Sequence, residues 1–106
     1  MKLLTQEIKK RFEKIGSQEE AGNDAIVIAK FFCPWNNWKW FATEFNAEDE
    51  IFFGLVMGSE TELGYFSLEE MSSVRGPVGM KLERDLYWEE QTIGEVRESI
   101  EKDGWA

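Results

Sequence analysis

The sequence predicts an α+β fold: an antiparallel meander sheet of four to five strands, with an N-terminal helix, a short middle helix and a C-terminal helix. Three observations predict it. Apolar residues near the start recur at spacings of four, four and three, which is typical of an amphipathic helix (Leu4, Ile8, Phe12 and Ile15). Four runs of β-branched and aromatic residues then follow across short polar turns. Two capping boxes of the Ser/Thr-x-x-Glu type indicate further helices.

The first half of the chain is expected to hold one helix and most of the sheet. Thr5 is a suitable N-cap for the helix, and Gly16 is expected to end it. A polar loop leads from this helix to the strands. The strands are predicted over 25–32, 38–45, 51–57 and 62–66, and their short connections make an antiparallel meander the simplest topology.

The second half is expected to add two helices and one more extended segment. The capping boxes at 67–70 and 92–95 each begin a helix, and Gly104 is expected to end the last one. Residues 82–88 are predicted to be a fifth extended segment. Because no linker or internal repeat divides the chain, residues 1–106 are expected to form a single domain.

The predicted central strands are apolar on both faces. Strict alternation places Phe41 and Phe45 on one face of the strand 38–45, with Trp40 and Ala42 on the other. A sheet with one solvated face would alternate apolar and polar residues instead. Something must therefore cover both faces, and helices of this chain, a second subunit and a bound ligand all remain open.

The composition excludes several classes of chemistry. The chain contains no histidine and one cysteine, which excludes histidine-based nucleophile systems and the usual zinc sites. It has no phosphate-binding loop and no dinucleotide fingerprint, so no cofactor, no metal and no catalytic residue is expected. The lone cysteine and the lack of a long apolar segment favour a cytoplasmic location.

The charge is acidic and unevenly distributed. Asp and Glu number 21 against 12 Lys and Arg, a net charge of −9, which disfavours nucleic acid and membrane partners. No Lys or Arg lies between Lys39 and Arg75, whereas many carboxylates do. Solvated turns and helix starts explain such a run, and so does an acidic surface that faces a basic protein.

An aromatic group and a lone thiol are the next candidates for chemistry. Trp35, Trp38, Trp40 and Phe41 are interpreted as core packing, as an interface that includes a homodimer, or as a stacking surface for a base. Cys33 has no cationic neighbour in the sequence, so it is expected to be a buried, inert thiol.

Charged residues of the acidic run and the later segments also leave alternatives. Glu60 and Glu62 are either solvated turn carboxylates or a pair that binds a divalent cation or shares a proton. The arginines and acids near the fifth segment either form structural ion pairs or hold a carboxylate or phosphate (Arg75, Glu83, Arg84 and Asp85).

The order and spacing of these motifs resemble one family, the bacterial domain of unknown function 2958, from Met1 to about Trp88. The motifs that carry the resemblance are Lys30-Phe31-Phe32 with Pro34, Trp38-Lys39-Trp40, Thr43-Glu44-Phe45, Phe52-Phe53-Gly54, Glu62-Leu63-Gly64-Tyr65-Phe66-Ser67-Leu68, Val74-Arg75-Gly76-Pro77 with Gly79, and Glu83-Arg84-Asp85.

The resemblance implies a context rather than an activity. Such proteins are similar to accessories of plasmids, phages and integrated elements, often near antirestriction or conjugation genes. The polar positions that match the family pattern are candidate binding positions without assigned roles: Glu44, Glu62, Tyr65, Arg75, Glu83, Arg84 and Asp85.

The leading expectation is a non-enzymatic accessory protein that binds another protein with a basic surface, with counter-defence as the role that the resemblance implies. The rival is a nucleotide or anion site built from Trp38, Trp40, Tyr65, Arg75 and Arg84, or a weak hydrolase that uses Glu44 or Glu62. A homodimer whose interface covers the second apolar face is a third hypothesis.

Overall fold

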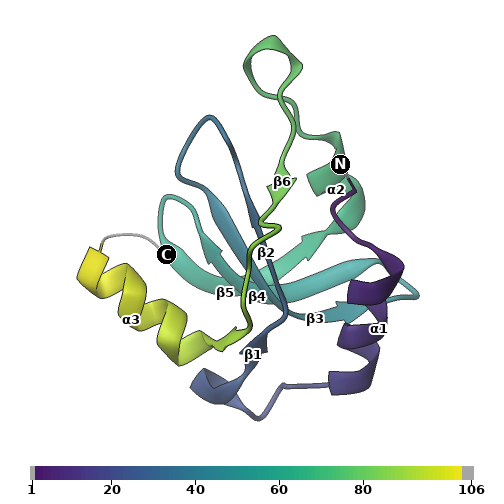
Figure 1. The fold of residues 1–106 in the computed structure, drawn as a ribbon, viewed down its shortest axis with the longest axis vertical. Coiled ribbons are helices and arrows are strands. Elements are labelled where there is room, and N and C mark those ends of the chain that lie inside the picture. The colour runs from purple at the N-terminus through teal and green to yellow at the C-terminus, as the bar shows by residue number, and fades with distance from the viewer. Residues whose placement is uncertain (1, 104–106) are drawn as a thin grey trace.

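The computed structural model describes residues 2–103 and has the predicted α+β architecture (Figure 1). Its elements in chain order are α1 (Gln6–Ile15), η1 (Gly22–Asp24), β1 (Ile26–Val27), β2 (Ala29–Phe32), β3 (Lys39–Asn46), β4 (Ile51–Met57), β5 (Thr61–Ser67), α2 (Leu68–Ser73), η2 (Pro77–Gly79), β6 (Glu83–Arg84), β7 (Gln91–Thr92) and α3 (Ile93–Asp103), where η marks a 3₁₀ turn.

The main sheet has five antiparallel strands in the order β5-β4-β3-β2-β6. Strands β2 to β5 form the predicted meander, and β6 pairs with β2 at the opposite edge from β5. A second, two-stranded ladder joins β1 to β7. Among the described residues, no helix is long and apolar enough to cross a membrane.

Local capping places the helices where the sequence predicts them. Thr5 accepts a hydrogen bond from an N–H group in the first turn of α1. The Ser67 hydroxyl accepts one from the N–H of Glu70 at 3.0 Å and so begins α2. Thr92 and Glu95 cap reciprocally, because each side chain accepts from the other residue's N–H, at 2.9 and 3.1 Å. These contacts satisfy N–H groups that the first turn of a helix leaves free.

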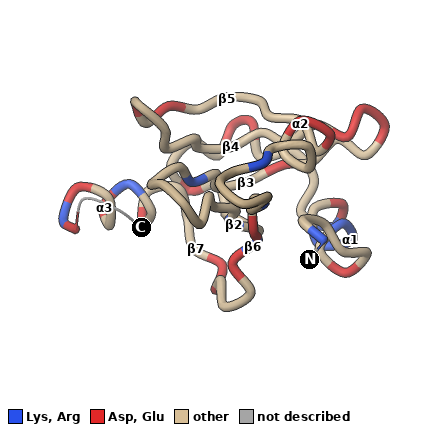
Figure 2. The backbone as a smooth tube through the Cα atoms, turned by 90° about the horizontal axis from the view of Figure 1, so that it is seen from above, with Lys and Arg blue, Asp and Glu red and all other residues tan. Residues whose placement is uncertain are grey.

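Helices of this chain cover both apolar faces of the sheet. Phe12 of α1 and Met71 of α2 pack with Phe52 on one face, called the α1 face below. Val96 of α3 packs with Phe41 on the other face, called the α3 face. The two views show α1 and α3 on opposite sides of the strands (Figures 1 and 2). The sequence left three alternatives for covering these faces: helices of this chain, a second subunit or a ligand. The structure shows helices of this chain on both faces.

The predicted strand over 25–32 is two strands rather than one. The chain leaves the main sheet at Ile28, whose N–H still donates to the carbonyl of Ala42 at 2.9 Å. The residues before it pair with β7 instead, with Ile26 opposite Thr92. The prediction of a single strand was wrong because β1 turns away from the main sheet toward the start of α3.

A β-bulge interrupts β3. Ala42 lies opposite Gly54 in β4, but the next pair is Glu44 with Phe53, so Thr43 is an extra residue on β3. A Cβ on Gly54 would stand 1.9 Å from a backbone oxygen of β3, which means that only glycine fits opposite the bulge.

Because of the bulge, the side chain of Phe45 lies on the opposite face of the sheet from the one predicted. An extra residue reverses the alternation of side chains along the rest of the strand. Phe45 therefore lies on the α1 face, 4.7 Å from Phe52 between ring centroids, whereas Phe41 lies on the α3 face. Strict alternation placed these two phenylalanines together because it takes no account of a bulge.

The last extended segment is shorter than predicted. Only Glu83–Arg84 of the segment 82–88 pairs as a strand, and a turn follows it. The pairing of β7 was not predicted at all. The expected helix end at Gly104 lies outside the described residues.

Candidate functional site

The strand β5 is the outermost strand of the main sheet, and no strand in the described part of the chain pairs with its outer side. Figure 2 shows Asp and Glu positions at the end of β5 and around α2. These exposed carboxylates come from the β3–β4 turn, the β4–β5 turn, β5 itself and α2: Glu48, Asp49, Glu50, Glu60, Glu62, Glu69 and Glu70. The strand and these carboxylates are called the acidic edge below.

The backbone direction along β5 follows from the ladder. The N–H of Leu68 donates to the carbonyl of Glu50 at 3.0 Å, which makes this a hydrogen-bonded pair that continues the β4–β5 register. In an antiparallel ladder every second residue turns its N–H and C=O groups to its partner. Leu63 and Tyr65 are out of phase with Leu68, so their backbone groups point away from β4, toward the open edge.

A pocket of about 300 Å³ lies on the α3 face beside this edge. Glu44, Phe53 and Tyr65 lie opposite one another in consecutive strands β3, β4 and β5 and form a row along it. The rings of Phe53 and Tyr65 are 4.9 Å apart between centroids and tilted by 59°. Leu63 completes the wall on β5. This hollow, with its aromatic side and its carboxylate, is called the β5 pocket.

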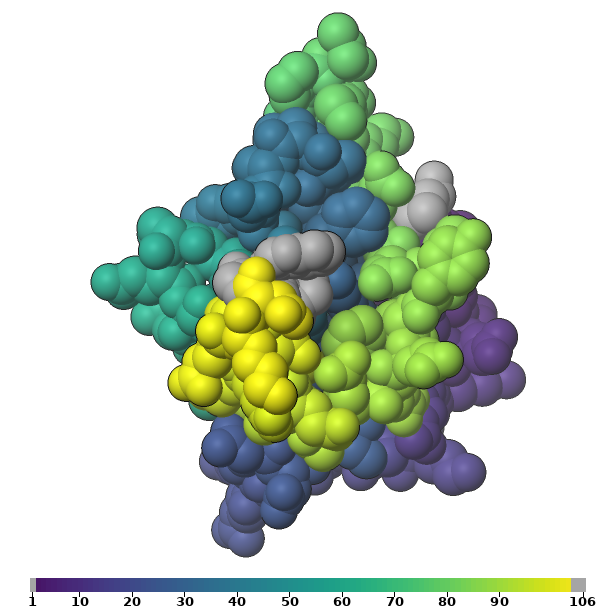
Figure 3. All heavy atoms as spheres, turned by 60° about the vertical axis from the view of Figure 1, so that its left-hand side comes forward, coloured from purple at the N-terminus to yellow at the C-terminus, as the bar shows by residue number. Residues whose placement is uncertain are grey.

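The helix α3 leaves the β5 side of this face open. In the space-filling view α3, in yellow, lies between the teal β4–β5 turn and the green segment that leads into β7 (Figure 3). Leu63 is 49% exposed and Tyr65 is 79% exposed. The pocket is therefore open to a partner from the β5 side.

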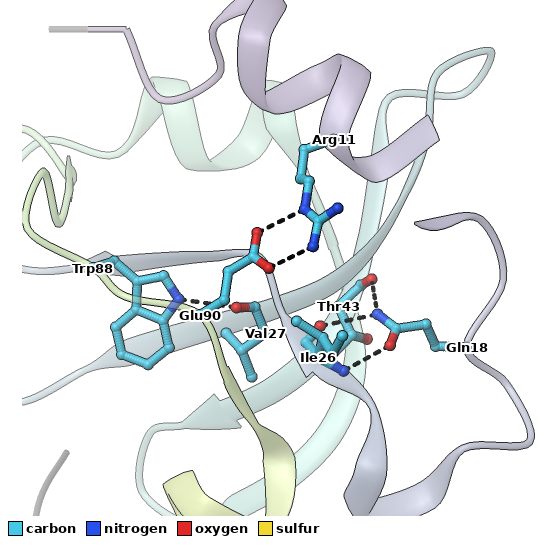
Figure 4. A network of polar contacts seen from close by, with 7 residues as sticks. All are labelled: Arg11, Gln18, Ile26, Val27, Thr43, Trp88 and Glu90. Carbon is cyan, nitrogen blue, oxygen red and sulfur yellow. Dashed lines mark hydrogen bonds and ion pairs between the residues drawn. The ribbon is translucent and has the colours of Figure 1, made fainter. Parts of the chain in front are cut away.

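Gln18, from the loop after α1, fixes the bulge that builds this pocket (Figure 4). Its side-chain N–H₂ group donates to the carbonyls of Ile26 and Thr43, at 2.9 and 2.8 Å, and its oxygen accepts from the N–H of Ile26 at 2.6 Å. The Thr43 hydroxyl donates to the carbonyl of Phe53 at 3.2 Å. Gln18 thus joins the bulge to β1, and the side chains of Gln18 and Thr43 bond backbone carbonyls at the bulge, those of Thr43 and Phe53.

The candidate carboxylates divide between the two faces of the sheet. Glu44 and Tyr65 meet in the β5 pocket. Glu62 lies opposite Val56, whose side chain packs on the α1 face, so Glu62 lies on that face too. The structure does not bring Glu44 and Glu62 into one site.

The two candidate tryptophans, Trp38 and Trp40, differ in their burial. Trp40 packs against the buried cluster of the α1 face, and Trp38 lies beside it with ring centroids 5.9 Å apart and ring planes tilted by 36°. The Trp38 ring lies over Gly58 and remains 41% exposed. This arrangement supports the core-packing interpretation for Trp40 and leaves Trp38 at the border of the surface.

The two candidate arginines hold the backbone at different places. Arg75 donates to the carbonyls of Ser72 and Val74 at 2.8 and 2.9 Å, within its own loop. Arg84 donates to the carbonyl of Lys2 at the start of the chain. Neither lines the β5 pocket, so the residues proposed for a nucleotide or anion site do not converge.

Asp85 forms an ion pair with Lys30, a residue outside the arginine–acid group that the sequence interpretation named. Its carboxylate lies 3.7 Å from the ammonium of the buried Lys30, which lies over the rings of Phe41 and Trp88. Burial lowers the pKa of Lys30, while the carboxylate of Asp85 acts in the opposite direction. Glu83 pairs through its backbone with Phe32 in β2.

A second hollow, of about 660 Å³, lies between α1 and the segment before β7. Arg11 crosses it and donates two hydrogen bonds to Glu90, at 2.8 and 2.7 Å (Figure 4). These bonds lower the pKa of the Glu90 carboxyl. The sequence reasoning missed this pair, which joins residues 79 positions apart. Because its arginine already holds a carboxylate, the hollow is a poorer site for an anion than its basic lining suggests.

The remaining candidates for chemistry are metal ligands and the thiol of Cys33. No cluster of three or more potential metal ligands occurs among residues 2–103. Cys33 is buried, and burial raises the pKa of its thiol, so the reactive thiolate is scarce near neutral pH. This agrees with the expectation of an inert thiol.

The fold and the site define an α+β protein whose helices cover both faces of an antiparallel sheet and whose outer strand forms an acidic edge. Residues 3–101 match the family model described as protein of unknown function (DUF2958), and the chain belongs to this family. Comparison with curated proteins and with solved structures finds no match.

Proposed function

We propose that this protein is a binding module for a second protein, and that its acidic edge takes a basic, extended segment of that partner. The observation that carries the proposal is the outward-facing backbone of Leu63 and Tyr65 within a rim of exposed carboxylates. Unpaired edge groups are a template for an added strand, which gives affinity through main-chain hydrogen bonds.

Charge selects the partner. The stretch from residue 40 to residue 74 contains no Lys or Arg, and it includes all of β4 and β5. Lys and Arg side chains on an added strand would lie near these carboxylates, which steers association and disfavours acidic competitors. The same charge opposes a homodimer through this edge, because two copies would bring like carboxylates together.

The rival small-molecule function has less support. Of its five proposed residues only Tyr65 lines the β5 pocket, while Arg75 and Arg84 hold separate backbone segments.

For the biological setting we propose a plasmid- or phage-borne accessory with a counter-defence role. Its carboxylates would occupy places that phosphates take on a basic host protein.

The test uses a short peptide that alternates arginine with threonine, and an acidic peptide that alternates glutamate with threonine. Isothermal titration with the wild-type protein is expected to show binding of the basic peptide only, weakened by added salt. Leu63→Pro removes an outward N–H without breaking a bond to β4, since proline is tolerated at such edge positions. We expect it to bind about tenfold more weakly than the matched control Leu63→Ala, which keeps that N–H.

Two results would contradict the proposal. Failure of the basic peptide to bind the wild-type protein refutes an edge that takes basic segments. Equal affinities of Leu63→Pro and Leu63→Ala show that the backbone of β5 takes no part in binding.

A further inference from the structure

The β5 pocket contains groups suited to one kind of side chain. Two aromatic rings, those of Phe53 and Tyr65, stand beside two carboxylates, those of Glu44 and Glu19. No Lys or Arg is among the residues that line it. Ring faces and carboxylates both attract cations, so the ligand chemistry is that of an organic cation.

A guanidinium fits these groups better than an ammonium does. It is planar, stacks on aromatic faces and is more weakly hydrated than the compact ammonium of lysine. Its forked N–H groups also match the two oxygens of a carboxylate. The row formed by Glu44, Phe53 and Tyr65 offers a carboxylate and two aromatic rings in consecutive strands.

The position of the pocket connects it with the acidic edge. Leu63 and Tyr65 line the pocket with their side chains, while their backbone groups face the open side of β5. A strand added to β5 would place every second side chain on this same face, next to Leu63 or Tyr65. A long side chain at such a position reaches the pocket.

We propose, on the basis of the proposed function, that the β5 pocket anchors an arginine side chain of the partner segment docked on β5. The bulge prepares the site, because it turns Glu44 onto the α3 face. Gln18 ties the bulge to β1, through one hydrogen bond to Thr43 and two to Ile26. The arginine gives this edge specificity beyond general attraction between opposite charges.

The test is an NMR titration of the whole protein with N-acetyl-arginine amide, and with the neutral isostere N-acetyl-citrulline amide. We expect saturable shifts of the Phe53 and Tyr65 signals with the arginine compound only. Glu44→Gln is expected to weaken that binding about tenfold or more, whereas Glu13→Gln, the same change at an exposed residue of α1 outside the acidic edge and the pocket, leaves it within about twofold.

A second pair of variants tests whether the ring of Tyr65 in the pocket contributes to binding, as distinct from the loss of any exposed tyrosine. Tyr65→Ala is expected to reduce the shifts, and Tyr87→Ala, which alters another highly exposed tyrosine outside the pocket, is expected to leave them unchanged. Both positions are solvent-exposed, so both variants should remain folded.

The outcomes distinguish this pocket from the edge itself. Absence of saturable shifts, or equal shifts in Glu44→Gln, overturns the arginine pocket, while continued binding of the alternating basic peptide leaves the proposed function standing. If the arginine compound binds but the basic peptide does not, the proposal of an arginine docked from a partner segment is overturned. The pocket would then be a site for a free small cation. Loss of both overturns both proposals.

Discussion

The contribution of Gln18 can be tested by removing its polar group. Gln18→Leu keeps a side chain of similar size but leaves three backbone groups without this partner: the N–H and C=O of Ile26 and the C=O of Thr43. Gln18 is half-buried, so water reaches these groups only in part. At about 1 kcal/mol for each group, the free energy of unfolding should fall by about 3 kcal/mol.

Chemical denaturation measures this change, with Gln6→Leu as the control. Gln6 is an exposed glutamine at the start of α1, and its replacement should alter stability by less than about 0.5 kcal/mol. If Gln18→Leu lowers the free energy of unfolding no more than Gln6→Leu does, the hydrogen bonds of Gln18 do not stabilise the bulge as proposed.

Gln18→Glu adds a test by pH. A glutamate keeps an acceptor for the Ile26 N–H, but its second oxygen faces two carbonyl oxygens, which raises its pKa in the folded state. The destabilisation therefore develops as the pH rises from the unfolded pKa through the raised folded pKa, and it is relieved at lower pH. Gln18→Leu should show no such dependence relative to wild type.

Three further predictions concern the scaffold. Gly54→Ala should lower the free energy of unfolding by about 3 kcal/mol or more, since its Cβ would meet a backbone oxygen, whereas Gly64→Ala, with open space around its Cβ, should be nearly neutral by the same denaturation assay. Val78 is fully exposed at a φ of 50°, so Val78→Asn should raise the thermal midpoint by relieving about 1 kcal/mol of strain; a lower midpoint contradicts this. The Arg11–Glu90 pair lowers the pKa of Glu90, so its stabilisation is present above the ordinary glutamate pKa and lost as the pH falls through the lowered one. The midpoints of wild type and Arg11→Met should therefore converge in acid, and a gap independent of pH would exclude this ion pair as its source.

Local signals explain why most of the fold could be predicted. The helices begin at capping groups close in sequence, such as Thr92 with Glu95, and the meander follows from short turns between apolar runs. These interactions depend on neighbours within a few residues, so the sequence reveals them without knowledge of the tertiary structure.

The bulge could not be predicted in the same way, because its cause is not local. It depends on Gln18, which is 25 residues from Thr43 in the chain, and on the close approach of Gly54. A glycine inside an apolar strand is the one signal of a bulge that the sequence offered, and the strand prediction did not use it.

The candidate site shows the same limit. The family pattern includes Glu44 and Tyr65, but only the register across three strands brings them together. Glu62 matches the pattern equally well, yet it lies on the opposite face. Phe53, which lies between Glu44 and Tyr65 in the pocket, is part of the family motif Phe52-Phe53-Gly54, but the sequence did not single it out as a binding residue.

The most direct test of the acidic edge is amide hydrogen exchange by NMR, with and without the alternating arginine–threonine peptide. In the free protein the outward amides of Leu63 and Tyr65 should exchange faster than the amides of Gly64 and Phe66, which face β4. Saturating peptide should protect the Leu63 and Tyr65 amides, because the added strand accepts their hydrogen bonds. Binding without protection of these two amides would contradict strand addition at β5.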